Sequence, residues 1–184
     1  MPALGSGDKE INAVDETLIK AFATLLQHLP GQAPADEDLR PWAERLASAW
    51  SDELLGGEAV DPGEALGGPM ALKTRRQEVA LSGIRFSLVC PHHLTLAVGE
   101  ASIRYQPRQL VAGPSGLVRL VDAVTRRRIL QEEAAELVAD TLEHVLQPQS
   151  IEVVLEAEQT CVSCRGVRRQ GTNFITRVTR GSVP

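Results

Sequence analysis

The amino-acid sequence predicts an α+β fold, in which a strand-strand-helix-helix-strand-strand unit follows an N-terminal helical extension. Three observations predict it. Up to Leu54, apolar residues recur every three or four positions, as they do on amphipathic helices. Residues 56–69 are rich in glycine and proline, which is typical of a linker or long loop. From Val79 onward, strand-like alternation comes first, a helical periodicity follows, and alternation then returns.

The chain therefore divides into three segments. Residues 1–12 lack an apolar pattern and are expected to form a flexible tail. Residues 13–69 form an N-terminal helical region and linker, and residues 70–184 form the main domain. With 184 residues, the chain is long enough to bury a hydrophobic core.

Two helices are expected in the N-terminal region. The first presents one apolar face from Val14 to Leu26 and ends at the Pro30-Gly31 pair. The second presents an apolar face from Leu39 to Leu54, with Asp36 or Asp38 as its candidate N-cap.

In the main domain, two strands, two helices and two further strands are expected in that order. The first strand should change register near Gly83-Ile84, where its alternation breaks. The expected strands cover about residues 79–88, 94–105, 151–156 and 174–178, and the expected helices about residues 117–124 and 130–145.

Composition and charge exclude some classes of function. Aromatic residues make up only 3% of the chain, which argues against a protein that stacks single-stranded nucleic acid on exposed rings. Residues 1–70 hold 4 Lys and Arg against 13 Asp and Glu, a net charge of −9. Residues 71–184 hold 15 against 11, a net charge of +4, so any anion-binding chemistry is expected there. The alternative is an acidic solvated surface beside a mixed one.

No targeting or spanning segment is predicted. The N-terminus lacks a basic region followed by an apolar core, and no apolar run approaches about 18 residues. We therefore expect a cytoplasmic protein with no membrane partner. In a reducing compartment, the three cysteines favour metal binding or reactive thiols over disulfides.

The segment Cys90-Pro91-His92-His93 is the first candidate site. A thiolate and an imidazole three residues apart can bind one zinc ion, and Cys161 or Cys164 can supply a third ligand. Three protein ligands leave one position open for water, as in catalytic zinc sites. Two alternatives remain: a C-x-x-C redox or structural zinc motif, or a buried Cys90 beside two surface histidines.

Charged residues supply the second candidate. Two arginine groups can pair with phosphates, although such runs are also common on solvated surfaces. The stretch from Gln131 to Glu133 begins the helix expected at residues 130–145, and acidic residues are favourable at a helix N-terminus. A carboxylate there can also accept the N1–H and 2-amino hydrogens of guanine. The arginines are Arg126, Arg127 and Arg128 in one group and Arg165, Arg168 and Arg169 in the other.

Taken together, these residues resemble the GTP cyclohydrolase I family. That family reads C-E-H-H, then Gly, Y-x-P, V-x-G-L-S-K-x-x-R, R-R-x-x-x-Q-E and H-x-C-x-x-x-R-G-V. The matching residues are CPHH at 90–93, Gly99, Tyr105 with Pro107, VAGPSGLVR at 111–119, RRRILQE at 126–132 and QTCVSCRGV at 159–167. No gap is needed across this stretch, and a looser likeness covers about residues 14–180.

The resemblance implies a zinc-dependent hydrolase that opens the imidazole ring of GTP, releases C8 as formate and forms 7,8-dihydroneopterin triphosphate. It implies zinc held by Cys90, His93 and Cys161, with Cys164 left as a packing residue. It implies that His92 donates a proton to the purine. It further implies substrate contacts from Ser115, Arg119, Gln131, Glu132 and Arg165.

The resemblance also implies the tunnelling fold, with pentameric barrels stacked into a decamer and active sites between subunits. Four positions depart from the family pattern: Gln159 replaces the histidine of H-x-C, Gly116 a lysine, Pro114 a leucine and Pro91 a glutamate. An amide cannot shuttle a proton, so the catalytic position at Gln159 predicts an altered substrate, a truncated reaction or a slow enzyme. The alternative is a non-catalytic relative that binds a purine or pterin as a regulatory or scaffold subunit.

Overall fold

The computed structural model describes residues 15–73 and 77–181, so the expected tail at residues 1–12 lies outside the described residues. The chain forms two compact units, Met1–Asp52 and Glu53–Pro184. This division falls inside the segment expected as one N-terminal helical region and linker, because residues from Glu53 onward pack with the main domain.

Two helices pack against each other in the first unit, α1 (Glu16–His28) and α2 (Asp36–Ser48). The Asp15 side chain caps α1 by accepting the Thr17 N–H. The N-cap of α2 is Ala35, so the expectation of Asp36 or Asp38 was wrong; both lie inside the first turn, where carboxylates favour the helix dipole. A π-helical turn, η1 (Ala49–Leu54), extends the second helix to the predicted end.

The glycine-rich stretch expected as a linker or long loop contains a short helix, α3 (Pro62–Leu66). Asp61 caps it by accepting the Glu64 N–H, and Pro62 occupies the first helical position, where no N–H is needed. The two-stranded sheet that follows joins β1 (Met70–Ala71) to β4 (Leu110–Val111).

The main sheet has four antiparallel strands in the order β2-β3-β5-β6. Their bounds are β2 (Val79–Val89), β3 (Leu96–Gln106), β5 (Ser150–Gln159) and β6 (Asn173–Gly181). The predicted register change in β2 is confirmed, because the pairing shifts between Leu81 and Ile84. Gly83 sits there with a φ of +72°, a left-handed conformation that glycine adopts without strain.

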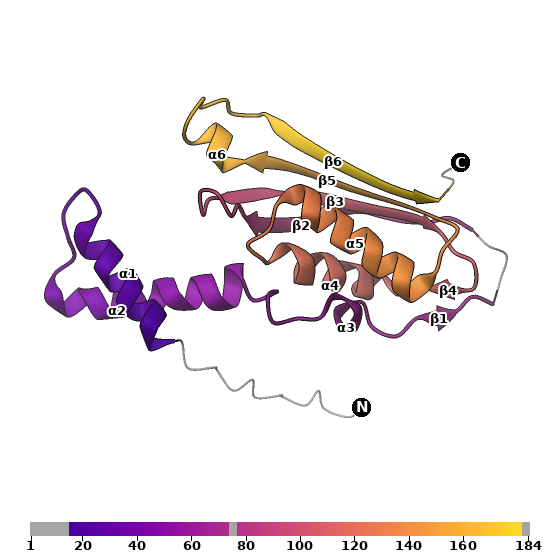
Figure 1. Cartoon of the computed structure of the whole chain (residues 1–184), viewed down its shortest axis with the longest axis horizontal. Coiled ribbons are helices and arrows are strands. Elements are labelled where there is room, and N and C mark those ends of the chain that lie inside the picture. The colour runs from indigo at the N-terminus through magenta and orange to yellow at the C-terminus, as the bar shows by residue number, and fades with distance from the viewer. Residues whose placement is uncertain (1–14, 74–76, 182–184) are drawn as a thin grey trace, which may run out of the picture. The chain divides into compact units, whose positions relative to one another are not determined.

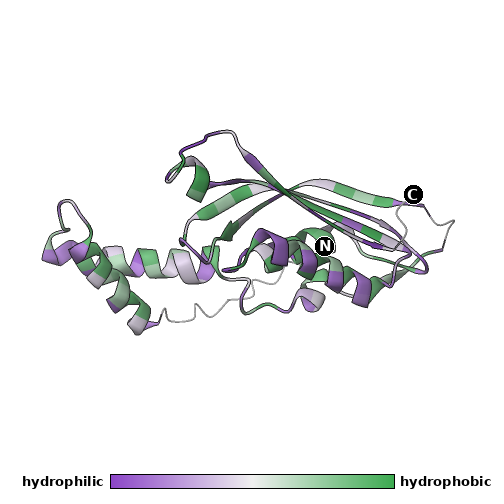
Figure 2. Cartoon of the chain, turned by 45° about the horizontal axis from the view of Figure 1, so that its top comes forward, coloured by the Kyte–Doolittle hydropathy of each residue, from purple (hydrophilic) through white to green (hydrophobic). Residues whose placement is uncertain are grey.

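The helices α4 (Pro114–Thr125) and α5 (Gln131–Leu146) lie together on one face of this sheet (Figure 1). Both ribbons carry purple and green residues, as amphipathic helices do (Figure 2). Burying each core leucine, valine or isoleucine contributes roughly 1.5–3 kcal/mol. The core joins Leu117, Leu120 and Val124 of α4, Val138 and Leu142 of α5, and Ile103, Val153 and Leu155 of the sheet.

The expected α+β order of strand-strand-helix-helix-strand-strand, after an N-terminal helical extension, is therefore confirmed. Among the described residues, no helix combines the length and the apolar character needed to cross a lipid bilayer.

Candidate metal centre

Cys90 and His93 lie in the tight connection between β2 and β3. The loop is closed at its base by the Cys90 N–H, which donates to the Thr95 carbonyl at 2.8 Å. Inside it, the Leu94 N–H donates to the Cys90 carbonyl at 2.9 Å. Leu94 has a φ of +51°, a conformation that costs free energy in a residue with a side chain. This bent backbone turns His93 back toward the buried Cys90.

Cys161 reaches the same place from the far end of the sequence. It belongs to α6 (Thr160–Ser163), a single turn that follows β5 directly. The Thr160 hydroxyl donates to the Leu96 carbonyl at 2.6 Å, which fixes this turn against the start of β3. Since β3 pairs with β5, the loop holding Cys90 and the turn holding Cys161 meet at one end of the sheet.

The potential ligand atoms of Cys90, His93 and Cys161 all lie within 4.8 Å of one another. The Cys90 Sγ and His93 Nδ1 atoms are 3.9 Å apart. Around a tetrahedral zinc ion, such atoms are separated by about 3.6–3.8 Å, given the usual zinc–ligand lengths. The structure thus brings these three residues together, with donor types that suit zinc. Cys164 is outside this group, and its exposed side chain shows that the expected packing role was wrong.

A pocket of about 300 Å³ adjoins these three residues. His92 and Glu132 both line it, and both side chains are exposed. The segment before α5 pairs with the end of β2, because Val89 donates to the Arg127 carbonyl and Ile129 donates to the Val89 carbonyl. This short pairing places Glu132, at the start of α5, beside the cysteine and histidine residues.

Gln131 and Gln159 also line the pocket and are bonded to each other. The Gln159 Nε2 donates to the Gln131 Oε1 at 2.7 Å. Gln131 is only 2% exposed, and its Nε2 lies within hydrogen-bond distance of the Leu155 and Phe174 carbonyls and the Thr176 hydroxyl. The Gln131 amide is therefore occupied within the chain, whereas the Glu132 carboxylate is exposed and has no hydrogen-bond partner in the part of the chain that the structure describes.

Phe174 is a lining residue that sequence reasoning missed. It comes from β6, is 43% exposed, and lies at the pocket with Leu88, Leu130 and Val162. Its apolar ring is suited to the flat face of a base. In the sequence, Phe174 reads only as a residue of an alternating strand, so its position became visible only once β5 and β6 were paired.

Two of the three arginines in the run from Arg126 to Arg128 donate hydrogen bonds to backbone carbonyls of the chain. The Arg126 Nε donates to the Glu53 carbonyl at 2.7 Å, and the Arg127 guanidinium donates to the carbonyls of Val60 and Ala123. The contacts with Glu53 and Val60 fasten the segment before α3 to the end of α4. Only Arg128 of the three is classed as exposed.

Three predicted substrate contacts lie away from this pocket. Ser115 and Arg119 are exposed in the first half of α4, whereas the pocket is lined by Ile129, Leu130, Gln131 and Glu132 around the start of α5. Arg119 donates from Nε to the Ala65 carbonyl at 2.9 Å. Arg165 is exposed in the loop after α6 but is not among the residues that line the pocket. One chain therefore does not bring all the predicted substrate contacts to one place.

The packing around position 116 explains why glycine stands there in place of the family lysine. A Cβ built on Gly116 would lie 2.2 Å from the carbonyl oxygen of Leu66, the last residue of α3. No side chain fits there unless the backbone moves. The close approach of α3 to α4 therefore requires glycine.

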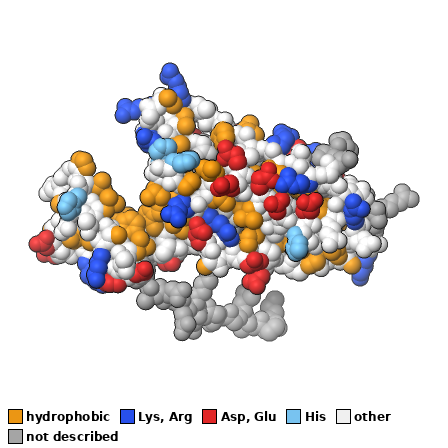
Figure 3. Space-filling view, in the orientation of Figure 1, with side chains coloured by type: hydrophobic (Ala, Val, Ile, Leu, Met, Phe, Trp, Pro, Cys, Tyr) orange, Lys and Arg blue, Asp and Glu red, His pale blue; other side chains and the backbone are white. Residues whose placement is uncertain are grey.

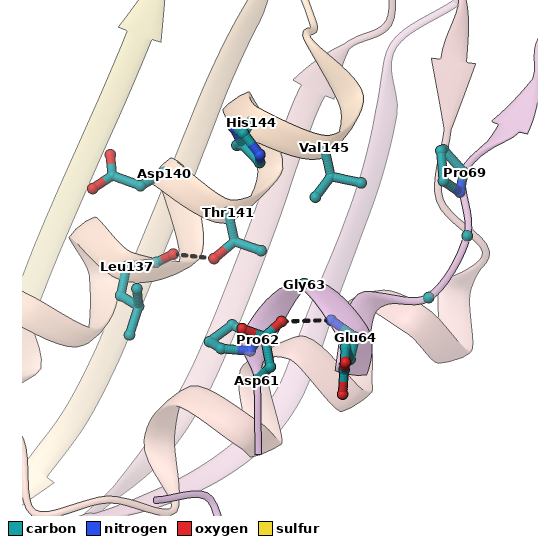
Figure 4. A pocket seen from close by; sticks show the side chains of 12 residues that line it. Asp61, Pro62, Gly63, Glu64, Pro69, Leu137, Asp140, Thr141, His144 and Val145 are labelled. Atoms are coloured by element: carbon teal, nitrogen blue, oxygen red, sulfur yellow. Dashed lines mark hydrogen bonds between the residues drawn. The ribbon is translucent and has the colours of Figure 1, made fainter. Parts of the chain in front are cut away.

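A larger cavity, of about 890 Å³, lies between α3 and α5. Asp61 and Glu64 line it on one side, and Asp140, Thr141 and His144 of α5 line it on the other (Figure 4). Acidic side chains also gather over α5 on the surface seen in Figure 3. Asp140 already pairs with Arg180, and Asp61 is the α3 cap. We place the candidate site at the smaller pocket, because among the described residues soft metal ligands converge only there.

Comparison with known proteins identifies the family to which the chain belongs. The family profile described as GTP cyclohydrolase I matches residues 18–184. The chain is 37% identical over 174 residues to the GTP cyclohydrolase 1 of Wolinella succinogenes, covering 95% of this chain and 89% of that protein. It is 37% identical over 169 residues to the GTP cyclohydrolase 1 of Bartonella quintana, covering 91% and 81%.

A solved structure supports the fold. The apo form of the archaeosine synthase QueF-Like is similar with a TM-score of 0.50 and 24% sequence identity, over 60% of this chain and 100% of that one. At this identity the likeness concerns the fold alone, and it agrees with the expected tunnelling fold.

Proposed function

Because the chain belongs to the GTP cyclohydrolase I family, we propose that it is a zinc-dependent hydrolase that opens the guanine imidazole ring of GTP. In the proposed reaction, water adds at C8, the ring opens, C8 leaves as formate, and the ribose carbons close a new ring to give 7,8-dihydroneopterin triphosphate. The observation that carries the proposal is the convergence of Cys90, His93 and Cys161 beside the exposed Glu132.

The three converging side chains fit a catalytic zinc site. Two thiolates and one imidazole are ligands that zinc prefers, and three protein ligands leave one position open. When bound, the ion supplies Lewis-acid activation of water at neutral pH. The pocket beside Cys90 and Cys161 gives a small molecule access to that position.

His92 and Glu132 carry the remaining chemistry that this chain provides at the pocket. His92 donates a proton to the purine, and imidazole is suited to this near pH 7. Protonation at N7 makes C8 more electrophilic. The Glu132 carboxylate accepts the N1–H and 2-amino hydrogens of guanine, which adenine cannot offer in that pattern. The ring of Phe174 covers an apolar part of the same pocket.

Ser115, Arg119 and Arg165 are proposed to bind the triphosphate or ribose from a neighbouring copy of the chain. Their separation from the pocket supports a site built between subunits. The free edges of β2 and β6 support the same idea, since a four-stranded sheet leaves two strands with unpaired backbone groups. We therefore propose a ring-shaped homo-oligomer, a decamer of two pentamers.

Gln159 and Gly116 support a slow or truncated reaction. The Gln159 amide cannot transfer a proton to or from a substrate, and its Nε2 already donates a hydrogen bond to Gln131. Gly116 removes one cationic phosphate contact. These two positions also keep a second candidate function open, in which the protein binds a purine or pterin without turning it over.

One assay separates the two functions. Zinc-loaded protein is incubated with GTP while formate release and pterin fluorescence are followed. Formate with fluorescent pterin supports the full reaction, and formate alone supports a reaction that stops early. Tight binding of GTP without formate would favour the non-catalytic function, and absence of both binding and turnover would contradict the proposal.

A further inference from the structure

A hydrogen bond links the side-chain amides of Gln131 and Gln159, and backbone carbonyls fix which end of each amide donates and which accepts. The Gln131 Nε2 faces the carbonyl oxygens of Leu155 and Phe174 at 2.9 and 3.0 Å. Only an NH₂ group can satisfy two carbonyl oxygens, so the reversed amide would place oxygen against oxygen. The burial of Gln131 makes that reversal costly, because the displaced groups would lose their partners away from water.

The orientation of the Gln131 amide also fixes the orientation of the Gln159 amide. Since the Gln131 Nε2 must face the strands, its Oε1 must face Gln159 and can only accept a hydrogen bond. Gln159 therefore has to donate from Nε2, as the 2.7 Å contact shows. The Gln159 Oε1 is left without a protein hydrogen bond among the described residues, and Gln159 lines the pocket next to Cys161.

We propose that Gln131 is a positioning residue that holds the Gln159 carbonyl oxygen toward the pocket as a fixed hydrogen-bond acceptor. Gln131 then acts through Gln159, without touching the base itself. This inference rests on the proposed function for the identity of the ligand, but the amide direction is a property of the free protein.

A fixed acceptor selects a chemical class of ligand. Gln159 lines the pocket beside the proposed metal ligands. Under the proposed function those ligands would hold the metal at C8, so the Gln159 oxygen would face the purine edge that carries position 7 and C8. An acceptor favours a purine that carries an N–H on this edge and gains nothing from one that carries C–H. The residue at position 159 thereby determines specificity for the protonated imidazole edge.

The amide direction can be tested without a ligand. Protein labelled with ¹⁵N only at glutamine side-chain amides is studied by solid-state NMR, which tolerates large assemblies, and amide hydrogen exchange is followed. The Gln159 signal, identified by its loss in Gln159→Leu, is expected to exchange more slowly than that of the exposed Gln109. In Gln131→Met this protection should disappear. Exchange of Gln159 as fast as Gln109 in the unaltered protein would overturn the inference.

The selectivity is tested with two nucleotides that resist ring opening. 8-Oxo-GTP carries an N–H at position 7, and 7-deaza-GTP carries C–H there. Calorimetry on the zinc-loaded full chain should show that Gln131→Met and Gln159→Leu each reduce the preference for 8-oxo-GTP about threefold to tenfold, the worth of one neutral hydrogen bond. Gln159→Leu leaves Gln131 in place and serves if Gln131→Met does not fold.

Matched controls separate the possible failures. Gln109→Leu removes a surface amide and should leave the preference unchanged. An unchanged preference in Gln159→Leu would overturn the proposed selectivity. If the unaltered protein binds neither nucleotide, the proposed function and the selectivity fail together, while the exchange measurement still decides the amide direction.

Discussion

The Sγ atom of Cys90 lies 3.9 Å from Nδ1 of His93, three residues further along the same loop. A separation close to that of two ligands on one zinc ion means that little reorganisation is needed to bind the metal. Cys161 completes the set from the turn after β5.

Replacement of Cys161 is expected to abolish zinc binding, whereas replacement of Cys164 is not. Cys161 belongs to the converging group and Cys164 is exposed outside it. After dialysis, elemental analysis should find about one zinc per chain in Cys164→Ala and little in Cys161→Ala. Equal losses in the two variants would point to a structural C-x-x-C site instead.

Glu132→Gln is expected to weaken guanine-nucleotide binding by about 1–3 kcal/mol, because an amide offers a hydrogen where the base also presents one. Calorimetry with GTP measures the loss. Glu133→Gln is the matched control: the Glu133 side chain accepts the Leu130 N–H, and an amide oxygen can still do so. Unchanged GTP binding in Glu132→Gln would remove Glu132 from the base-reading role.

The protein is expected to assemble into a ring. Light scattering at micromolar concentration should give a mass near ten times that of the 19.9 kDa chain. The exposed Ile175 on the edge strand β6 is one apolar group that assembly would cover. A monomer with intact secondary structure would contradict this prediction and, with it, the shared active site.

Much of the fold could be predicted from the sequence because local patterns specify it. The alternation of β2 breaks at Gly83, where the structure places the register change. The helix α3 escaped prediction because its five residues are too few to show a period, and glycine and proline mask them. A cap at Asp61 followed by Pro62 was the available signal.

Only the residues of the candidate site that belong to rare, chemically distinctive types could be predicted from the sequence. Cysteine and histidine at a ligand spacing stand out from a sequence, so Cys90 and a neighbouring histidine could be named from spacing, whereas the choice of Cys161 over Cys164 came from the family resemblance. Arginines do not stand out, and Arg127 is seen to hold backbone carbonyls only once the chain is folded. The bond between Gln131 and Gln159 joins residues 28 positions apart and has no sequence signal.

Tyr105→Phe is expected to destabilise the main domain by about 1–3 kcal/mol. The Ala112 N–H donates to the Tyr105 hydroxyl oxygen at 3.1 Å, and Tyr105 is 1% exposed, so the variant leaves a buried donor without a partner. Chemical denaturation at pH 8 measures the difference. A change below about 0.5 kcal/mol would mean that the Ala112 N–H finds another partner.

Tyr105 also makes the stability of the main domain depend on pH in the alkaline range. Burial raises the pKa of Tyr105 above its ordinary value, although the Ala112 hydrogen bond opposes this. Above about pH 10 the unfolded chain releases the tyrosine proton that the folded chain retains, so this residue makes stability fall as pH rises. Tyr105→Phe lacks this contribution, so the difference in free energy of unfolding between the two proteins should become smaller in this alkaline range. Because the chain holds 1 tyrosine, tyrosinate absorbance follows the titration directly.

Gln159→His is expected to raise turnover of GTP by restoring the second imidazole of the family pattern. The unaltered protein keeps His92 and the converging metal ligands, so addition of water at C8 and ring opening remain within its means. Later proton transfers lack a group, because Gln159 cannot shuttle a proton. One acid–base group is worth roughly 10²–10⁴ in rate, which sets the upper limit of the gain.

The gain should fall below that limit for a reason visible in the packing. Gly116 cannot regain the family lysine, because a Cβ there would meet the Leu66 carbonyl at 2.2 Å, so the phosphates stay less well held. The imidazole can still donate one N–H to the Gln131 Oε1, as Gln159 does now, and direct its other nitrogen to the pocket. Single-turnover formate release and pterin fluorescence are compared for the two proteins at equal zinc content. An unaltered protein that already forms the pterin at roughly 1 per second or faster would show that Gln159 imposes no defect.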